Sequence, residues 1–184
     1  MINIRIETER LIIDTVTEGD CNASYLSWLQ DPEVNQFLES GFHQHTIEGI
    51  KQFVKDQANA VFVAVRIKGN NKHIGNIKIA KIHSIHKTAE YGIMMGDKSE
   101  WGKGYAKEAT IAVLNYCFNT LNLRKICLGV IDLNSHAHSL YKRLGFKEEG
   151  VFKENFFYYP NSNFRDEIRM ALFKKDWPIN NELK

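Results

Sequence analysis

The stretch that decides the fold is residues 90–118, EYGIMMGDKSEWGKGYAKEATIAVLNYCF. Residues 91–95 are short and apolar, as is typical of a buried strand, and Gly96 and Asp97 end the apolar run. From Gly104 onward, apolar residues recur every three or four positions, which predicts one face of a long amphipathic helix. The stretch therefore predicts a strand, a glycine-bearing turn and a helix.

The turn at residues 102–106, Gly-Lys-Gly-Tyr-Ala, offers consecutive backbone N–H groups where the helix dipole is positive. Such a turn can hold a phosphate or pyrophosphate, although glycine turns before helices are also common without a ligand. A P-loop is excluded because no Lys-Ser or Lys-Thr follows the second glycine. A dinucleotide-binding turn is disfavoured because its third glycine would fall at Lys107.

Length and composition predict one globular domain over residues 1–184. The chain has 184 residues, of which 43% are hydrophobic and 25% charged, which is ordinary for a globular protein. We find no repeat, linker or low-complexity tract. The net charge of +2 comes from scattered basic and acidic residues. No basic patch therefore points to a nucleic-acid partner.

The cysteines and the apolar runs favour a cytoplasmic protein without a membrane partner. Cys21, Cys117 and Cys127 are odd in number and lack CxxC spacing, so we expect reduced, mostly buried thiols. The N-terminus has no apolar core of a signal peptide. The longest apolar run, residues 60–65, is far too short to span a bilayer.

Periodicity and end signals place the remaining elements. Asp31 before Pro32 predicts a helix start, Thr46 and Asn134 are expected caps, and Gly145 is expected to end a helix. We predict helices at residues 20–29, from Asp31, at 46–58 and from Asn134 to Gly145. We predict strands at residues 9–16, 60–67, 74–82, 125–130, 147–155 and 164–173, with a loop at 159–163. The expected fold is α/β, with a mixed, mostly antiparallel sheet and helices on both faces.

The segment WGKGYA, residues 101–106, resembles the acyl-CoA pyrophosphate loop of the GCN5-related N-acetyltransferases, the GNAT superfamily. That loop has Gln or Arg, two residues, Gly, one residue, then Gly or Ala. Trp101 stands where the pattern has Gln or Arg. This departure is common in the branch of ribosomal-protein N-terminal and amino-sugar acetyltransferases.

A second match lies in residues 132–146, DLNSHAHSLYKRLGF. It resembles the family pattern Asn-x-x-Ala-x-x-x-Tyr-x-x-x-Gly-Phe at Asn134, Ala137, Tyr141, Gly145 and Phe146. A weaker resemblance extends from residues 7–11 to Asp176-Trp177, so it covers nearly the whole chain.

The resemblance implies an acetyl-CoA-dependent N-acetyltransferase whose sheet splays beside the central strand. Transfer is expected by direct attack of an amine on the thioester. The implied acetyl-CoA contacts lie on the strand, the turn and the second motif: Met94, Met95, Trp101, Gly102, Lys103, Gly104, Tyr105, Ala106 and Asn134.

Two side chains are candidate catalytic groups. Tyr141 matches the family's general acid, and a phenol of pKa about 10 protonates a thiolate of pKa about 8.5 at a cost of only ~2 kcal/mol. A packed helix tyrosine is the alternative. Glu90 can accept the amine's proton, directly or through water, or it is a solvated strand-end carboxylate. The need for a base depends on the acceptor, since neutralising a lysine-like amine at pH 7 costs ~4.6 kcal/mol and an α-amine only about 1.

The acceptor is expected between the N-terminal helices and the last two strands. Candidate lining residues are Trp28, Glu33, Phe37, Glu39 and Tyr159. The aromatic residues of 156–164 favour a small-molecule amine, an amino sugar, free or nucleotide-linked, over a protein N-terminus. They are otherwise explained by strand packing or a homodimer contact.

A sensor that binds CoA without turnover is the rival of another class, and the presence of Tyr141 argues for the enzyme. The pairs His43/His45, His83/His86 and His136/His138 lack nearby carboxylates or cysteines at metal-site spacing, so we expect no metal. A monomer or a homodimer is expected.

Overall fold

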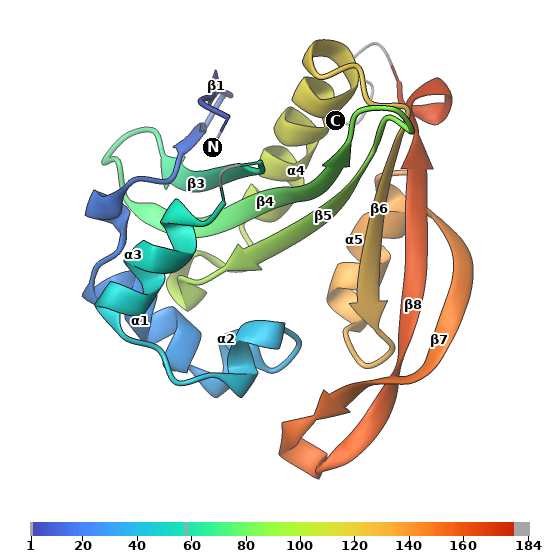
Figure 1. Cartoon of the computed structure of the whole chain (residues 1–184). Helices are drawn as coiled ribbons and strands as arrows, with labels where there is room; N and C mark the ends of the chain where they lie inside the picture. The colour runs from blue at the N-terminus through green and yellow to red at the C-terminus, as the bar shows by residue number, and fades with distance from the viewer. Residues whose placement is uncertain (1, 58, 179–184) are drawn as a thin grey trace.

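The fold is built on one eight-stranded sheet. The computed structural model describes residues 2–57 and 59–178 (Figure 1). The strands are β1 (Arg5–Glu7), β2 (Leu11–Thr15), β3 (Val61–Ile67), β4 (His73–His83), β5 (Thr88–Met95), β6 (Lys125–Ile131), β7 (Lys147–Tyr158) and β8 (Asn163–Phe173). Their order is β1-β2-β3-β4-β5-β6-β8-β7. Only the β5–β6 pair among them is parallel, so the predicted mixed, mostly antiparallel sheet is confirmed.

Helices cover both faces of this sheet, as predicted. Figure 1 shows α1, α2 and α3 on one side and α4 and α5 on the other. The helices are α1 (Ala23–Gln30), α2 (Pro32–Asn35), α3 (Ile47–Lys55), α4 (Tyr105–Asn115) and α5 (Ser135–Arg143). A π-helical segment, Tyr116–Thr120, prolongs α4, and short 3-10 turns include η1 (Glu18–Asp20), η2 (Glu39–Phe42) and η3 (Lys98–Glu100).

The alternating strand β3 divides the apolar core into two layers. Val61, Val63 and Val65 point into the main cluster beneath α4 and α5. Phe62 and Ala64 point the other way, into a smaller cluster with α1 and α3. Because successive strand side chains face opposite sides, the same division continues along β4 and β5.

The strands β5 and β6 pair over a short segment and then diverge. Their register joins only Thr88, Ala89 and Glu90 to Lys125, Ile126 and Cys127. Beyond this segment the two strands diverge, as Figure 1 shows, and β6 continues to pair with β8. The splay implied by the family resemblance is therefore present, and it leaves one edge of β5 open.

Sequence and structure differ mainly in the lengths of elements. The edge strand β1 was missed because three residues are too few to show alternation. β7 runs three residues past the predicted end, and β-bulges within it break the period of two. The caps Asn22, Asp31, Thr46 and Asn134 each accept a backbone N–H. Position 58 of the predicted third helix lies outside the described residues.

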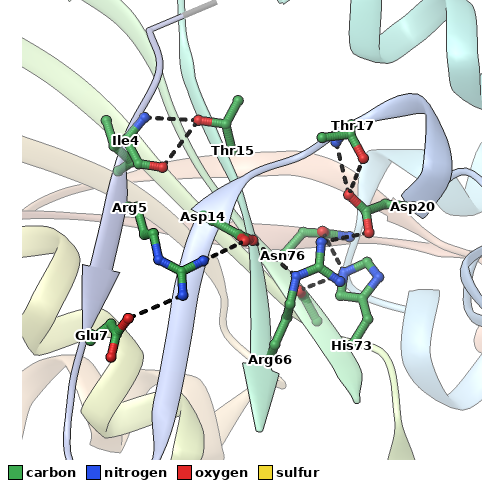
Figure 2. Close-up of polar contacts among 11 residues, drawn as sticks. Ile4, Arg5, Glu7, Asp14, Thr15, Thr17, Asp20, Arg66, His73 and Asn76 are labelled. Carbon is green, nitrogen blue, oxygen red and sulfur yellow. Dashed lines mark hydrogen bonds and ion pairs between the residues drawn. The ribbon is translucent and has the colours of Figure 1, made fainter. Parts of the chain in front are cut away.

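A partly buried ion network fixes the N-terminal strands. Arg66 of β3 donates to Asp14 (2.9 Å) and to Asp20 (2.6 Å), as shown in Figure 2. Burial by itself would raise the pKa of Asp20. Hydrogen bonds from Thr17 and Arg66 outweigh burial and hold this pKa below its usual value. The network joins β2 and β3 to η1, the short turn that precedes α1.

Among the described residues, no helix combines the length and the apolar character needed to cross a bilayer.

Trp28 packs directly on Gly96, at the end of β5. A Cβ atom at Gly96 would overlap the indole ring. We therefore expect Gly96→Ala to lower the free energy of unfolding by about 1–3 kcal/mol, measured by urea denaturation. Gly92→Ala is the matched control, because no heavy atom lies within 4 Å of its Cβ position, and it should change stability by less than about 0.5 kcal/mol. Equal stability of the two variants would contradict this packing.

Candidate active site

The open edge of β5 presents backbone donors toward the splay. Hydrogen-bonded and non-hydrogen-bonded pairs alternate in an antiparallel ladder. The N–H of Gly96 donates to Ile74, and the register pairs Met94 with Asn76, so the N–H of Met94 points toward β4. The amides of Ile93 and Met95 consequently point toward β6. The prediction that both Met94 and Met95 offer free amides is therefore wrong for Met94, and Ile93 takes its place.

Trp101 supports the open edge from the following turn. Its indole Nε1 donates to the backbone oxygen of Met95 at 2.8 Å. This contact confirms that the carbonyl of Met95 faces away from β4. The tryptophan, which stands where the resembled motif has Gln or Arg, thus joins the turn to the strand end.

The turn before α4 has the backbone of an anion-binding turn. Gly102 and Gly104 have φ angles of +75° and +82°, a region that favours glycine. No heavy atom lies within 4 Å of the Cβ position of Gly102, so the space beside it is open. The first N–H groups of α4 have no partner within the helix. Their dipole and the open space fit a pyrophosphate.

Arg10 adds a positive charge that sequence reasoning did not assign. Its Nη1 donates to the carbonyl of Lys103 (2.9 Å), and its guanidinium lies 4.6 Å from the ring centre of Tyr105. Glu108 accepts from the Nε of Arg10 (2.7 Å) and from its backbone N–H (2.9 Å). Nothing in the sequence joins positions this far apart. The contact places one guanidinium beside the turn.

Tyr141 lies on the α4 and α5 side of the sheet. Its ring makes edge contact with Tyr91 of β5, at a centroid distance of 6.1 Å, and contacts Phe146 at 5.8 Å. The side chain is buried, and burial raises the pKa of its phenol above the usual value. The phenol therefore holds its proton at neutral pH, as a proton donor must.

Glu90 lies on the opposite face, at the last position of β5 that pairs with β6. It forms ion pairs with Lys81 (2.8 Å) and with Arg169 (3.0 Å). Burial alone would raise its pKa, but the two cations outweigh burial and lower it. Glu90 is therefore ionised at neutral pH, with a weakened affinity for a proton.

Asn134 occupies the position that the second motif predicts. Its side chain caps α5 by accepting the N–H of Ala137 at 3.2 Å. The structural role is thereby observed, and its contact with the cofactor stays a prediction.

A cavity on the α1 and α3 side of the sheet can receive the acceptor. It measures about 460 Å³ and reaches β5 beside the splayed edge. Among the described residues that line it, Glu39 carries the one carboxylate. The cavity is also lined by polar side chains and by residues of β4 and β5, including Ser40, His43, His45, Asn76, Lys78, Gly92 and Met94. A second cavity of about 520 Å³ lies between the α2 region and the β7–β8 hairpin, and Tyr159 lines it.

Three predicted acceptor contacts lie elsewhere. Trp28 packs on Gly96 and His73 and faces a separate polar cavity. Glu33 forms an exposed ion pair with Lys98 (2.9 Å). Phe37 stacks on Tyr158 at a centroid distance of 5.6 Å. Helical spacing gives the face of a residue on its own helix, but not which neighbouring element covers that face.

The aromatic residues of the β7–β8 hairpin contact the α2 region. Phe42 packs on Phe156 (5.4 Å) and Tyr159 (5.3 Å), and the hydroxyl of Tyr158 donates to Gln36 (2.8 Å). The hairpin tip therefore closes one side of the second cavity, which Tyr159 lines, and the contact of Tyr159 with the acceptor stays a prediction.

The histidine pairs do not form a metal centre in the described part of the chain. His83 and His86 stack at 4.1 Å, and His138 contacts Glu148 at 2.9 Å. No group of three or more His, Cys, Asp or Glu side chains in residues 2–57 and 59–178 is placed to hold an ion.

Comparisons with known proteins agree with this geometry. A family model described as an acetyltransferase (GNAT) domain matches residues 10–147. The spermidine N(1)-acetyltransferase of Escherichia coli K12 is 30% identical over 171 residues, which cover 92% of this chain and 84% of that protein.

Two solved structures show the same fold. Spermidine N-acetyltransferase from Vibrio cholerae, in complex with CoA and spermine, superposes with a TM-score of 0.81 and 25% identity over 92% of this chain and 98% of that chain. The ribosomal-protein-S5-alanine acetyltransferase from Vibrio fischeri gives 0.80 with 21% identity, over 95% and 99% of the two chains. The second likeness concerns the fold alone.

The turn geometry predicts a specific loss of affinity. Gly104→Val places a branched side chain at a φ of +82°, beside the amides that we expect to face the pyrophosphate. We expect acetyl-CoA to bind at least about tenfold more weakly, or ~1.4 kcal/mol, by calorimetry. Gly150→Val is the control, because its Cβ position is open and it lies on the exposed strand β7. Unchanged affinity in folded Gly104→Val would refute this placement.

Proposed function

The chain belongs to the GNAT acetyltransferase family and is an acetyl-CoA-dependent N-acetyltransferase, and we propose that its acceptor is the primary amine of a small molecule. The amine attacks the thioester directly. The observation that carries the proposal is the cavity of about 460 Å³ that meets the open edge of β5. A cavity of this size suits a small molecule better than the open groove that a protein N-terminus needs.

The open edge of β5 can be reached from both faces of the sheet, and the two faces carry different side chains. Acetyl-CoA, when bound, supplies an acetyl group on a good thiolate leaving group. The N–H groups of Ile93 and Met95 point to the side where the thioester lies in this proposal, and they stabilise charge on its oxygen. The acceptor comes from the α1 and α3 face. Tyr141 lies on the other face, where it protonates the departing thiolate.

The proton of the attacking amine goes to Glu90, directly or through water. Glu90 shares the acceptor face with Gly92 and Met94, because residues two apart on a strand face the same way. Its ion pairs with Lys81 and Arg169 make it a weak base. A weak base suits an amine of low pKa. Neutralising a lysine-like amine costs ~4.6 kcal/mol at pH 7, far more than for an amine near pKa 7.8.

An amino sugar is the first acceptor class that we propose. Its oxygen substituents withdraw electrons and lower the pKa of the amine, which fits a weak base. A polyamine is the second candidate, because relatives 30% identical to this chain are named spermidine N(1)-acetyltransferases. Against it, the cavity offers one described carboxylate, Glu39, to a molecule that carries several ammonium groups.

Tyr141→Phe tests the proton donor. The aromatic contacts of Tyr141 are made by its ring, so phenylalanine retains them, and acetyl-CoA affinity should stay unchanged. We expect kcat to fall on the order of a hundredfold. The measurement is thiol release at saturating substrates, with calorimetry of acetyl-CoA as the control for folding. Turnover equal to wild type would assign the acid role to another group, such as water.

A screen of amines tests the acceptor class. Thiol release from acetyl-CoA is followed with amino sugars, spermidine and N-terminal peptides at equal concentration. We expect the highest kcat/KM with an amino sugar. Faster release with spermidine would favour the second candidate, and release with peptides alone would reject a small-molecule acceptor. Binding of acetyl-CoA without release for any amine would point instead to a CoA sensor.

A further inference from the structure

The hydrogen bonds of one half-buried histidine, His73, fix the orientation of a side-chain amide that lines the acceptor cavity. Nε2 of His73 lies 3.0 Å from the backbone oxygen of Gly75 and 3.0 Å from the side-chain oxygen of Asn76 (Figure 2). A backbone carbonyl only accepts hydrogen bonds, so Nε2 must carry the hydrogen. Burial lowers the pKa of His73, which keeps the ring neutral, with its hydrogen on Nε2.

This tautomer decides which way the Asn76 amide points. An amide oxygen and nitrogen are told apart by their partners, and a donating Nε2 requires the oxygen to face His73. The amide nitrogen Nδ2 is therefore turned away from the histidine. Asn76 is only 3% exposed. Among the buried side-chain nitrogen and oxygen atoms that the structure describes, its Nδ2 is the one without a hydrogen-bond partner.

Such an orphan donor is uncommon in proteins and calls for an explanation. Asn76 lines the cavity between α1, α3 and the sheet. Its Nδ2 is thus an unpaired donor, among the described residues, on a side chain that belongs to the wall of the acceptor cavity. An ammonium group cannot satisfy it, because both groups only donate.

A second unpaired donor stands two residues along the same strand. Lys78 shares the face of Asn76 and lines the same cavity. Its Nζ lies 4.9 Å from the ring centre of Phe53, and within the described residues it forms no ion pair. Burial and then the charge of Lys81 lower its pKa. The ammonium of Lys78 is therefore half-buried, and no ion-pair partner for it lies in the described part of the chain.

We propose that Asn76 and Lys78 together bind an anionic oxygen group, a phosphate or a carboxylate, that the acceptor molecule carries in addition to its amine. The inference rests on the proposed function and narrows it. An oxyanion accepts the hydrogen bond that Nδ2 lacks and supplies the counter-charge that Nζ lacks. Asn76 and Lys78 are accordingly specificity-determining residues, and a purely cationic polyamine satisfies neither of them.

Matched pairs of amines test this anion requirement. Thiol release from acetyl-CoA is compared for glucosamine and glucosamine 6-phosphate, and for an amino acid and its amide. The second pair separates a carboxylate from a phosphate. We expect one anionic member to have a kcat/KM at least about tenfold above its neutral partner and above spermidine. Equal rates within both pairs, or a preference for spermidine, would overturn the inference and leave the acetyltransferase assignment intact.

Substitutions then assign the effect to the two residues. Lys78→Met should raise KM for the preferred anionic amine by about tenfold or more and leave kcat and the KM of the neutral partner nearly unchanged. Lys78→Arg should retain most of the preference. Lys55→Met is the charge-matched control, since Lys55 lies on α3 in an exposed ion pair with Glu18. An equal loss for charged and neutral amines in Lys78→Met would mean a structural role and overturn the assignment.

Asn76→Asp retains an oxygen toward His73 and replaces the free donor by an acceptor. We expect it to weaken the anionic amine selectively as well, by repulsion. If this variant fails to fold, Lys78→Met decides the question alone. If acetyl-CoA binds but no amine releases thiol, the proposed function itself fails, and this inference falls with it.

Discussion

The loss of pairing between β5 and β6 is the constraint on which the rest of the structure depends. After Glu90 and Cys127 the two strands belong to different halves of the sheet, β5 to β1–β4 and β6 to β7 and β8. Backbone donors left unpaired by this splay need partners. A ligand that lies along the open edge can satisfy Ile93 and Met95. The same divergence gives access to that edge from both faces.

In the proposed reaction, the two faces of the sheet have different roles. On the side of α4 and α5, apolar packing surrounds Tyr141 and keeps its phenol protonated. On the side of α1 and α3, Glu90 is held as an anion by Lys81 and Arg169. In the proposed reaction, β5 therefore separates the proton donor from the proton acceptor. Neither group can neutralise the other before the reaction.

The first motif depends on support from distant residues. Trp101 joins the turn to the end of β5, and Arg10, held by Glu108, lies against the turn from the N-terminal segment. A turn with two glycines in left-handed conformations would otherwise be a flexible ligand site. In the proposed site, these contacts lower the entropic cost of ordering the turn when it binds a pyrophosphate.

The sequence by itself determined the order and type of the main elements, the caps at Asn134 and Thr46 and the turn at residues 102–106, because these depend on local periodicity and backbone preference. It did not determine which amides of β5 are free, since that depends on register, nor that Trp28 packs on Gly96. Tertiary structure also decides that Arg10 contacts the turn and that Asn76 and Lys78 line the same cavity. Such contacts join positions far apart in the chain, and no local pattern encodes them.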